Sequence, residues 1–294
     1  DDFRTAVMLG EDYSTDISEN TTLRTLDLQS QLLEHQEKLI QTTRMPTIAA
    51  FGQISYIGQE RVAGLAALMG AVVFAVRGWM ILGWVAAALI IGVSYSGGPL
   101  KLGFRGLGEL VIFVMFGPLM MSGVYYAITG TLDWKITWLS IAVGLLVTNI
   151  VYSHSVLDSI PDQKMGKKTM AHLMGGPKGQ IFLSALINTV PYLMVVTAVA
   201  IKVFSLPVSV DGLHWAYLAV LLIFPVSLWL VGSLNDHVTG KETSLEPRKW
   251  MGNMGDWENY KKAGVAWFLL RWLTARNIVT RFCLIIIVVN FIVG

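Results

Sequence analysis

Residues Asn149 to Thr169 read NIVYSHSVLDSIPDQKMGKKT. They close one long apolar segment, Ile136 to Tyr152, and a second, Ile181 to Leu206, follows soon after. A transmembrane helix needs roughly 20 mainly apolar residues to cross about 30 Å of hydrocarbon. The quoted stretch therefore connects two predicted membrane spans and lies where the chain leaves the membrane. We expect an all-α fold, a multi-pass transmembrane helical bundle.

Two carboxylates and three lysines stand out in this stretch. Asp158 and Asp162 are four residues apart, and on a helix that spacing puts both on one face. Lys164, Lys167 and Lys168 follow them. Mg²⁺ binds one or two carboxylates together with waters and phosphate oxygens, so the pattern suits a magnesium ion shared with a phosphorylated substrate. The alternative is a solvated loop whose lysines follow the positive-inside rule.

The composition indicates an integral membrane protein. Of 294 residues, 54% are hydrophobic and only 14% are charged, and the mean hydropathy is +0.57. Soluble globular chains carry about 25% charged residues. The net charge of +2 implies no polybasic surface, so no nucleic-acid partner is expected. The one cysteine, Cys283, excludes an intrachain disulfide and a cysteine-based metal site.

Seven segments are apolar enough to be predicted spans. They are about 62–76, 79–97, 107–128, 136–153, 180–204, 213–234 and 277–293. Residues 1–60 are polar and form a separate segment, so we divide the chain into 1–60 and a transmembrane bundle over 61–294. The basic, tryptophan-rich segment 250–275 predicts an amphipathic helix at the membrane surface.

The distribution of basic residues predicts the orientation. One side of the predicted bundle holds the loops around Lys101 and Asp158 and the basic 235–276 segment, while the other side holds only Arg77, Lys135 and Lys202. By the positive-inside rule the basic side faces the cytoplasm. The polar segment 1–60 is then cytoplasmic too, and a site built from several of these loops is geometrically possible.

A second informative stretch runs from Tyr95 to Glu109 and reads YSGGPLKLGFRGLGE. Its glycines let the backbone come close to a ligand or to another helix. Lys101 and Arg105 lie among them and are able to hold an anion. Glu109 lies near the start of a span, where an ionisable residue points to function. The alternative is a tight turn with snorkelling basic side chains.

Both stretches resemble one family. Asp158-x₃-Asp162-x₃-Gly166-Lys167-x-Thr169 is similar to the second aspartate-rich motif of the UbiA-type intramembrane prenyltransferases, and most similar to the branch that prenylates 1,4-dihydroxy-2-naphthoate in menaquinone synthesis. The resemblance continues through the second stretch to Phe116-Gly117-Pro118 and Gly123-x-Tyr125-Tyr126. Gly52-Gln53-Ile54-Ser55 also resembles the segment before the third helix of that family.

The sequence also departs from the family pattern. That family has nine membrane helices, so we expect two further helices before Asp1, where the chain starts without Met. Asp1-Asp2-Phe3 with Gly10-Glu11-Asp12 resembles a degenerate first aspartate motif, and a competing register uses Asp12 and Asp16. His154 stands where the naphthoate branch generally has asparagine.

The resemblance implies a transferase that moves a polyprenyl group from polyprenyl diphosphate to an aromatic acceptor within membrane lipid. It implies Mg²⁺ as cofactor, bound by Asp158 and Asp162, with a partner ion on Asp2, Asp12 or Asp16. The residues implied to bind the diphosphate are Lys101, Arg105, Lys167 and Lys168. Asp158, Asp162, Lys101 and Tyr95 are implied to be catalytic, and Tyr125, Tyr126 and Tyr152 are further candidates to support a carbocation.

Other functions fit the same composition. One is a transporter, for which broken helices and polar residues at the membrane midplane are expected. Another is an inactive relative that binds lipid, and a third is the same chemistry on another aromatic or lipid acceptor. The expected location is the cell membrane, with the active site toward the cytoplasm.

Overall fold

The computed structural model describes residues 68–97, 100–204, 212–241 and 246–293. The chain divides into two compact units, Asp1–Val72 and Val73–Gly294. In the first unit the described residues, 68–72, are helical. The degenerate aspartate motif with Asp2, Asp12 and Asp16 lies outside the described residues. All other described residues belong to the second unit.

Helices make up the second unit, and its described residues form no strand. The long elements are α3 (Trp79–Ser96), α4 (Gly108–Val114), η2 (Met115–Leu119), α5 (Met120–Thr129), α6 (Trp134–Leu157), α9 (Pro177–Val203), η3 (Trp215–Ile223), α10 (Phe224–Val238) and α12 (Ala266–Val293). The short elements are η1 (Leu102–Phe104), α7 (Ser159–Lys164), α8 (Met170–Leu173), η4 (Lys249–Met251) and α11 (Trp257–Lys262). The expected all-α fold is confirmed.

Five helices of the described chain are long and apolar enough to cross a membrane, rather than the seven expected. They are Gly108–Thr129, Trp134–Leu157, Pro177–Val203, Trp215–Val238 and Ala266–Val293. The other two expected spans correspond to shorter apolar helices, Leu68–Arg77 and Met80–Tyr95. The break between them at Gly78, where φ is 68°, falls where the sequence predicted it, and the difference is one of length, since each of these two apolar helices is shorter than 18 residues.

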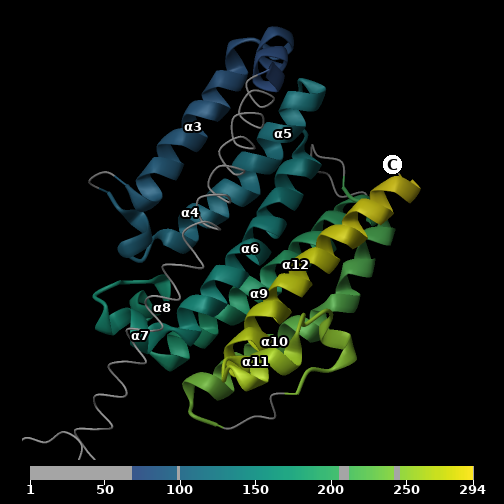
Figure 1. The fold of residues 1–294 in the computed structure, drawn as a ribbon. Coiled ribbons are helices and arrows are strands. Elements are labelled where there is room, and N and C mark those ends of the chain that lie inside the picture. The colour runs from purple at the N-terminus through teal and green to yellow at the C-terminus, as the bar shows by residue number, and fades with distance from the viewer. Residues whose placement is uncertain (1–67, 98–99, 205–211, 242–245, 294) are drawn as a thin grey trace, which may run out of the picture. The chain divides into compact units, whose positions relative to one another are not determined.

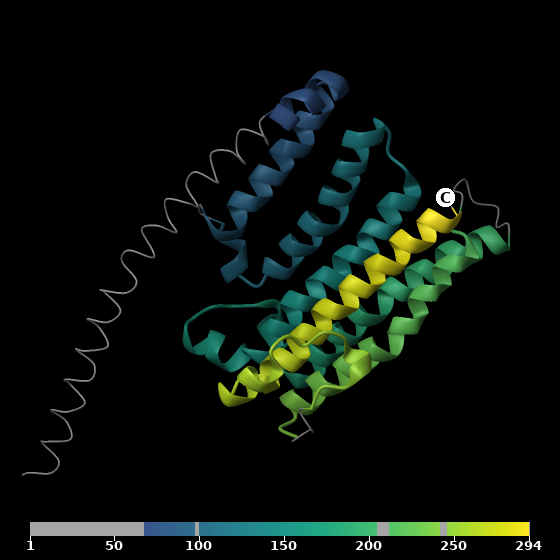
Figure 2. The same cartoon turned by 45° about the vertical axis from the view of Figure 1, so that its right-hand side comes forward.

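Helix α6 is the centre of the bundle and contacts α9, α12, η2, α4, α5 and α10 (Figures 1 and 2). Its polar residues meet partners across the interface. Asn149 and Asn188 exchange two amide hydrogen bonds, of 2.9 and 2.8 Å, between α6 and α9. Such bonds hold helices together in hydrocarbon, where water cannot satisfy the amides.

Helix α6 and η2 approach each other at two glycines. A Cβ added to Gly144 would lie 2.8 Å from the Cα of Gly117 and 3.0 Å from the carbonyl oxygen of Phe113. The π-turn η2 contains Pro118, and Gly117 has non-helical dihedrals there. Small residues allow this backbone contact, which sets the position of α4 and its side chains against α6.

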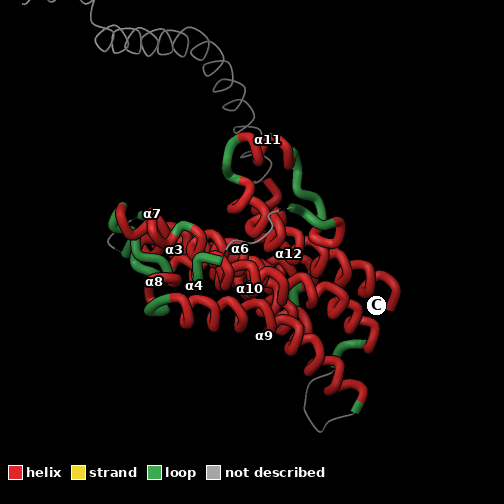
Figure 3. The backbone as a smooth tube through the Cα atoms, turned by 90° about the horizontal axis from the view of Figure 1, so that it is seen from below, coloured by secondary structure: helices red, strands yellow, loops and turns green. Residues whose placement is uncertain are grey.

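Three connections lie at the same end of the bundle, because successive long helices run in alternating directions. These are the described parts of 97–107, 158–176 and 239–265, and Figures 1 and 2 show α7, α8 and α11 at that end. In Figure 3 the helices are joined there by loops and short helical turns. The expectation that the two informative stretches share one end is confirmed.

The connection between α10 and α12 contains an exposed ion pair. The Lys261 ammonium lies 2.7 Å from Glu246 Oε1. This hydrogen bond lowers the pKa of the Glu246 carboxyl and raises the pKa of Lys261. It links the residues before η4 to α11.

Helix α12 begins earlier than expected. It starts at Ala266 rather than near 277, so the predicted surface helix over 250–275 is wrong: Trp267 and Trp272 belong to α12. The charged Arg271 does not end the span, because its guanidinium is buried and donates to the carbonyl oxygens of Ser233 and Trp267.

Candidate functional site

Asp158 and Asp162 lie at the junction of α6 and α7. Helix α6 ends at Leu157, and the Asp162 N–H donates to the Asp158 carbonyl oxygen at 2.9 Å, so the two residues are one helical turn apart. Their side chains have different partners. Asp158 is half-buried and lies 3.4 Å from His154 Nε2, while Asp162 is 4% exposed and lies 3.0 Å from Lys167 Nζ.

His172 fixes the shape of the segment that carries these aspartates. Its Nε2 lies 2.7 Å from the Ser159 carbonyl oxygen, so this nitrogen carries the proton and donates. Its Nδ1 then accepts from the Thr169 N–H at 3.1 Å and from the Thr169 hydroxyl at 2.8 Å. The imidazole thus joins the start of α7 to the start of α8.

The two sequence stretches meet at the backbone. The Lys168 N–H donates to the Phe104 carbonyl oxygen at 3.2 Å, in an isolated parallel bridge between Arg105 and Lys168. Gly106 has φ of 80°, and a Cβ there would lie 2.5 Å from Leu173 Cδ1. Glycine suits this turn because its φ is positive and because any other residue would displace the Leu173 side chain.

An inner cavity of about 300 Å³ lies between these stretches and the bundle. Its wall comes from α3, α4, α6, α12 and the segment before α8. Its polar and aromatic lining includes Tyr95, Glu109, His154, Ser155, Lys167 and Trp272. The cavity joins residues that are far apart in the sequence, which is typical of a ligand site between helices.

Tyr95 lies against two glycines of the cavity wall. A Cβ on Gly103 would lie 3.3 Å from the Tyr95 ring, and one on Gly108 would lie 3.5 Å from it. The contact at Gly103 is tight, whereas at Gly108 the closer neighbour of an added Cβ is the Cα of Gly103, at 3.2 Å. This explains part of the glycine content of the second stretch.

An outer cavity of about 290 Å³ is lined by Gln163, Gly166, Lys167, Lys168, His172 and Leu173. Lys167 lines both cavities. The residue therefore lies between the two cavities, and its ammonium pairs with the Asp162 carboxylate at 3.0 Å. Two lysines in one small cavity suit an anion.

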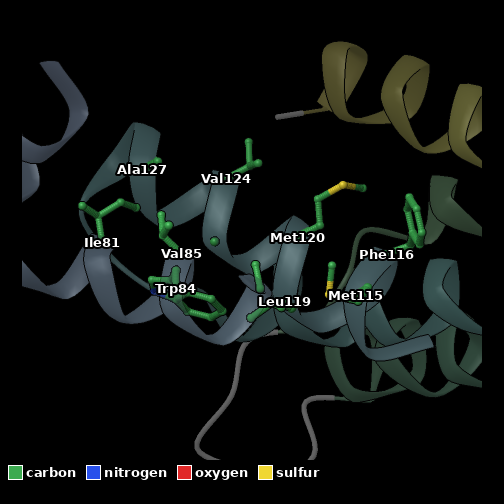
Figure 4. Close-up of a pocket in the computed structure, with 11 residues that line it drawn as sticks. Ile81, Trp84, Val85, Met115, Phe116, Leu119, Met120, Val124 and Ala127 are labelled. Carbon is green, nitrogen blue, oxygen red and sulfur yellow. The ribbon is translucent and has the colours of Figure 1, made fainter. Parts of the chain in front are cut away.

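A third pocket is apolar. It measures about 320 Å³ and lies between α3 and the η2–α5 segment, as Figure 4 shows. Its lining includes Trp84, Ala88, Met115, Leu119 and Gly123. Helices α3 and α4–η2 wall both this pocket and the inner cavity, and a Cβ on Gly92 would lie 4.0 Å from Met115 Cε, between the two.

The structure brings some predicted residues together and not others. Tyr95 and Lys167 line the inner cavity, with Asp162 paired to Lys167, and Lys168 lines the outer cavity. Lys101 and Arg105 are exposed residues of the η1 turn, which adjoins Lys168.

Two of the other tyrosine candidates have their hydroxyl groups elsewhere: Tyr152 donates to the Gln180 carbonyl oxygen and Tyr126 to Met80. In the described part of the chain no group of three or more His, Cys, Asp or Glu residues is arranged to hold a metal ion. A metal ion here would therefore depend on a pair of carboxylates and on the substrate.

The sequence alone assigned no role in the site to Ser155, Thr169 or Trp272, although Thr169 closes the aspartate motif. Each lines the inner cavity, and Ser155 and Trp272 carry no signal in the sequence, because serine and tryptophan are common in membrane helices and their borders. Glu109 did carry a signal, an ionisable residue at the start of a span, but the sequence did not show its partners.

Comparison with known proteins identifies the family. The model of the UbiA prenyltransferase family matches residues 37–251. A 2-carboxy-1,4-naphthoquinone phytyltransferase of Synechocystis sp. is 28% identical over 142 residues, 47% of this chain and 45% of that protein. A 1,4-dihydroxy-2-naphthoate octaprenyltransferase of Bacillus subtilis is 32% identical over 133 residues, 45% of this chain and 42% of that protein.

A protein of the same name in Haemophilus influenzae is 31% identical over 113 residues, 38% of this chain and 37% of that protein. The matches thus cover less than half the length of these relatives. No solved structure matches the chain. The family match extends over well more than half of the chain and includes both motif stretches, so this chain belongs to the UbiA prenyltransferase family.

Proposed function

We propose that this protein is a membrane-embedded, Mg²⁺-dependent enzyme that transfers a polyprenyl group from polyprenyl diphosphate to a hydroxylated aromatic quinone precursor. The acceptor proposed first is 1,4-dihydroxy-2-naphthoate, which is named for the relatives from Haemophilus influenzae and Bacillus subtilis. The proposed site is the pair of cavities that meet at Lys167.

The position of Lys167 carries the proposal. Its side chain lines both cavities and pairs with the buried Asp162. The cationic outer cavity suits a diphosphate, and the inner cavity, with Tyr95 and Trp272 in its wall, suits an aromatic ring. The carbon–oxygen bond that breaks would then lie near the Lys167 ammonium, and Lys101 and Arg105 on the adjoining turn would hold outer phosphate oxygens.

The two aspartates suit Mg²⁺. Mg²⁺ keeps several waters and takes only one or two carboxylates together with substrate phosphates, so a pair is enough. Asp158 and Asp162 are one turn apart and would be the carboxylates that hold the ion. When bound, Mg²⁺ neutralises the charge that develops on the departing diphosphate. The aspartates proposed for a second ion, Asp2, Asp12 and Asp16, lie outside the described residues.

The rest of the reaction needs a dry site with an aromatic face. As the carbon–oxygen bond of the prenyl diphosphate breaks, positive charge develops on the allylic carbon, and the face of Tyr95 would stabilise it. The ring of the acceptor then forms the new carbon–carbon bond. We propose that the polyprenyl chain extends from the inner cavity past Gly92 into the apolar pocket between α3 and α5.

We place the enzyme in the cell membrane with this site toward the cytoplasm. The connections at the end of the bundle that carries the site hold most of the lysine and arginine residues that the structure describes, while Arg77, Lys135 and Lys202 lie toward the other end. The positive-inside rule then puts the site on the cytoplasmic side.

Incubation of the purified full chain with radiolabelled polyprenyl diphosphate and 1,4-dihydroxy-2-naphthoate, with and without Mg²⁺, tests the function. The expected result is a labelled prenylated product that requires both the acceptor and Mg²⁺. Binding of the donor with no product from any hydroxylated aromatic acceptor would instead identify a lipid-binding relative. Transport of a solute without chemical change would identify a transporter.

A further inference from the structure

Glu109 is a buried carboxylate in the wall of the inner cavity. It lies within the span Gly108–Thr129, and the residue is only 2% exposed. Burying an ionised carboxylate in a membrane bundle is costly unless hydrogen bonds compensate, and such residues mark functional sites. Neither the proposed binding of diphosphate nor the proposed binding of Mg²⁺ uses Glu109.

Two protein donors already hold the carboxylate. The Ser155 hydroxyl donates to Oε1 at 2.7 Å, and the Met170 N–H lies 3.3 Å from Oε1 and 3.4 Å from Oε2. An ionised carboxylate has about four lone-pair positions, so it is able to accept a further hydrogen bond. Because Glu109 lines the cavity, that further donor can come from a ligand inside it.

The other titratable groups around Glu109 have different partners. The Lys167 ammonium is paired with Asp162 at 3.0 Å, and His154 Nε2 faces Asp158 at 3.4 Å. The Tyr152 hydroxyl near Glu109 donates to the Gln180 carbonyl oxygen. The remaining titratable group of the wall is the phenol of Tyr95, which is not an acidic side chain. The Glu109 carboxylate is thus the acidic side chain of this cavity wall.

We propose that Glu109 is a further catalytic residue, which accepts the proton of a ring hydroxyl of the aromatic acceptor. This inference rests on the proposed function and extends it to the recognition of the acceptor. The hydroxyl proton moves to the Glu109 carboxylate, and the electron pair of that O–H bond delocalises into the ring. The ring carbon bonds to the allylic carbon as the carbon–oxygen bond to diphosphate breaks, and diphosphate leaves. The resulting ketone then regains its aromatic ring when the hydrogen on the new tetrahedral carbon moves to the oxygen as a proton.

Glu109→Gln tests this role, because glutamine keeps the size of the side chain but cannot accept the proton. With the full chain, a labelled prenyl diphosphate and 1,4-dihydroxy-2-naphthoate, transfer at pH 7 is expected to fall by about 10²–10⁴-fold, the usual contribution of a general base. The deficit should shrink by about tenfold for each unit of rising pH, since the acceptor hydroxyl ionises by itself near a pKa of about 10, as a phenol does.

Two controls separate this role from a structural one. Thr148→Val removes a buried α6 hydroxyl that donates to the Gly144 carbonyl oxygen, outside the cavity lining, and it should leave transfer and its pH profile unchanged. Binding of a non-reactive thiodiphosphate analogue of the donor, measured with Mg²⁺, should be the same in Glu109→Gln and wild type. That result would show that the outer cavity and the α7–α8 segment remain formed.

Transfer by Glu109→Gln at the wild-type rate, or a deficit that is constant with pH, would overturn the inference while leaving the proposed function intact. Absence of transfer by the wild type to any hydroxylated aromatic would instead overturn the proposed function. If Glu109→Gln does not accumulate in membranes, Glu109→Asp tests the same role. Its carboxylate is on a side chain shorter by one methylene, so the KM for the acceptor should rise and kcat should fall, while the pH profile stays that of the wild type. Unchanged kinetics with the acceptor would refute the role.

Discussion

The Lys168 N–H donates to the Phe104 carbonyl oxygen at 3.2 Å, and this bond joins the two sequence stretches that carry the proposed site. Both partners are backbone groups, so this bond does not depend on the side chain of Lys168 or of Phe104. Variants of Asp162 or Lys167 also break the ion pair between these two residues, so their effect on stability has to be measured beside their effect on turnover.

Asp158→Ala and Asp162→Ala are each expected to reduce turnover at least about a hundredfold, because each removes a carboxylate proposed to hold Mg²⁺. Formation of radiolabelled product by the purified variants measures the effect. Asp133→Asn is the matched control: this residue caps α6 at the opposite end of the bundle, and asparagine caps a helix as well as aspartate does. Near-normal activity of both alanine variants would show that the metal assignment is wrong.

Removing the metal is expected to abolish transfer without unfolding the protein. Mg²⁺ is proposed to act on the leaving group, whereas the described bundle is held by helix packing and by bonds such as the Asn149–Asn188 pair. Excess EDTA should stop product formation, added Mg²⁺ should restore it, and the helical circular dichroism signal should not change. Full turnover in excess EDTA would contradict the proposed Mg²⁺ dependence.

Lys167→Met is expected to lower both stability and turnover. It leaves Asp162 buried without its cation, which costs about 1–3 kcal/mol here, less than for a fully buried pair because the Lys167 side chain is 32% exposed. Lys164→Met, an exposed residue of the same segment, should change neither. Adding Asp162→Asn to Lys167→Met should recover thermal stability but not activity. Recovery of both would mean that the two residues act only on the fold.

Ala88→Trp is expected to shorten the donor that the enzyme accepts, because Ala88 lines the apolar pocket proposed for the polyprenyl chain. Displacing about two methylene groups from the pocket costs roughly 1.6 kcal/mol, or a little more than tenfold. The ratio of kcat/KM for an octaprenyl donor to that for a geranyl donor should fall by this factor. Leu89→Trp is the control, since Leu89 is exposed on the same helix and does not line the pocket.

An unchanged ratio in Ala88→Trp would place the chain elsewhere in the bundle. A similar fall of the ratio in Ala88→Trp and Leu89→Trp would also contradict the proposed path of the polyprenyl chain, since it would reflect a general effect on α3 rather than on the pocket.

Gly144→Ala is expected to destabilise the bundle by about 1–3 kcal/mol, since the new methyl group would lie 2.8 Å from Gly117 Cα and push η2 away from α6. Gly232→Ala in α10 has no atom within 4 Å of the new Cβ and gains up to about 1 kcal/mol of helix propensity. Thermal unfolding in detergent should show a lower midpoint for the first variant only. Equal midpoints would show that the glycine contact is not needed.

The helical class was predictable from local pattern, and so was the position of the polar stretch that carries the proposed site. Hydrocarbon cannot hydrogen-bond the backbone, so each long apolar segment, such as the one that ends at Tyr152, has to be a helix. The polar stretch after it then lies at the edge of the membrane. The boundaries were less predictable, because the buried Arg271 lies inside α12 only by virtue of carbonyl partners that the sequence does not reveal.

The sequence by itself therefore determined that this protein is a multi-pass helical bundle with aspartates and lysines gathered at one end. Only the tertiary structure decided that Glu109 faces the same cavity as Lys167, while Lys101 remains exposed. The physical reason is that a side chain's neighbours across a bundle depend on how closely the backbones pack. Here the contact between Gly117 and Gly144 sets α4 against α6, and so brings Glu109 to Ser155.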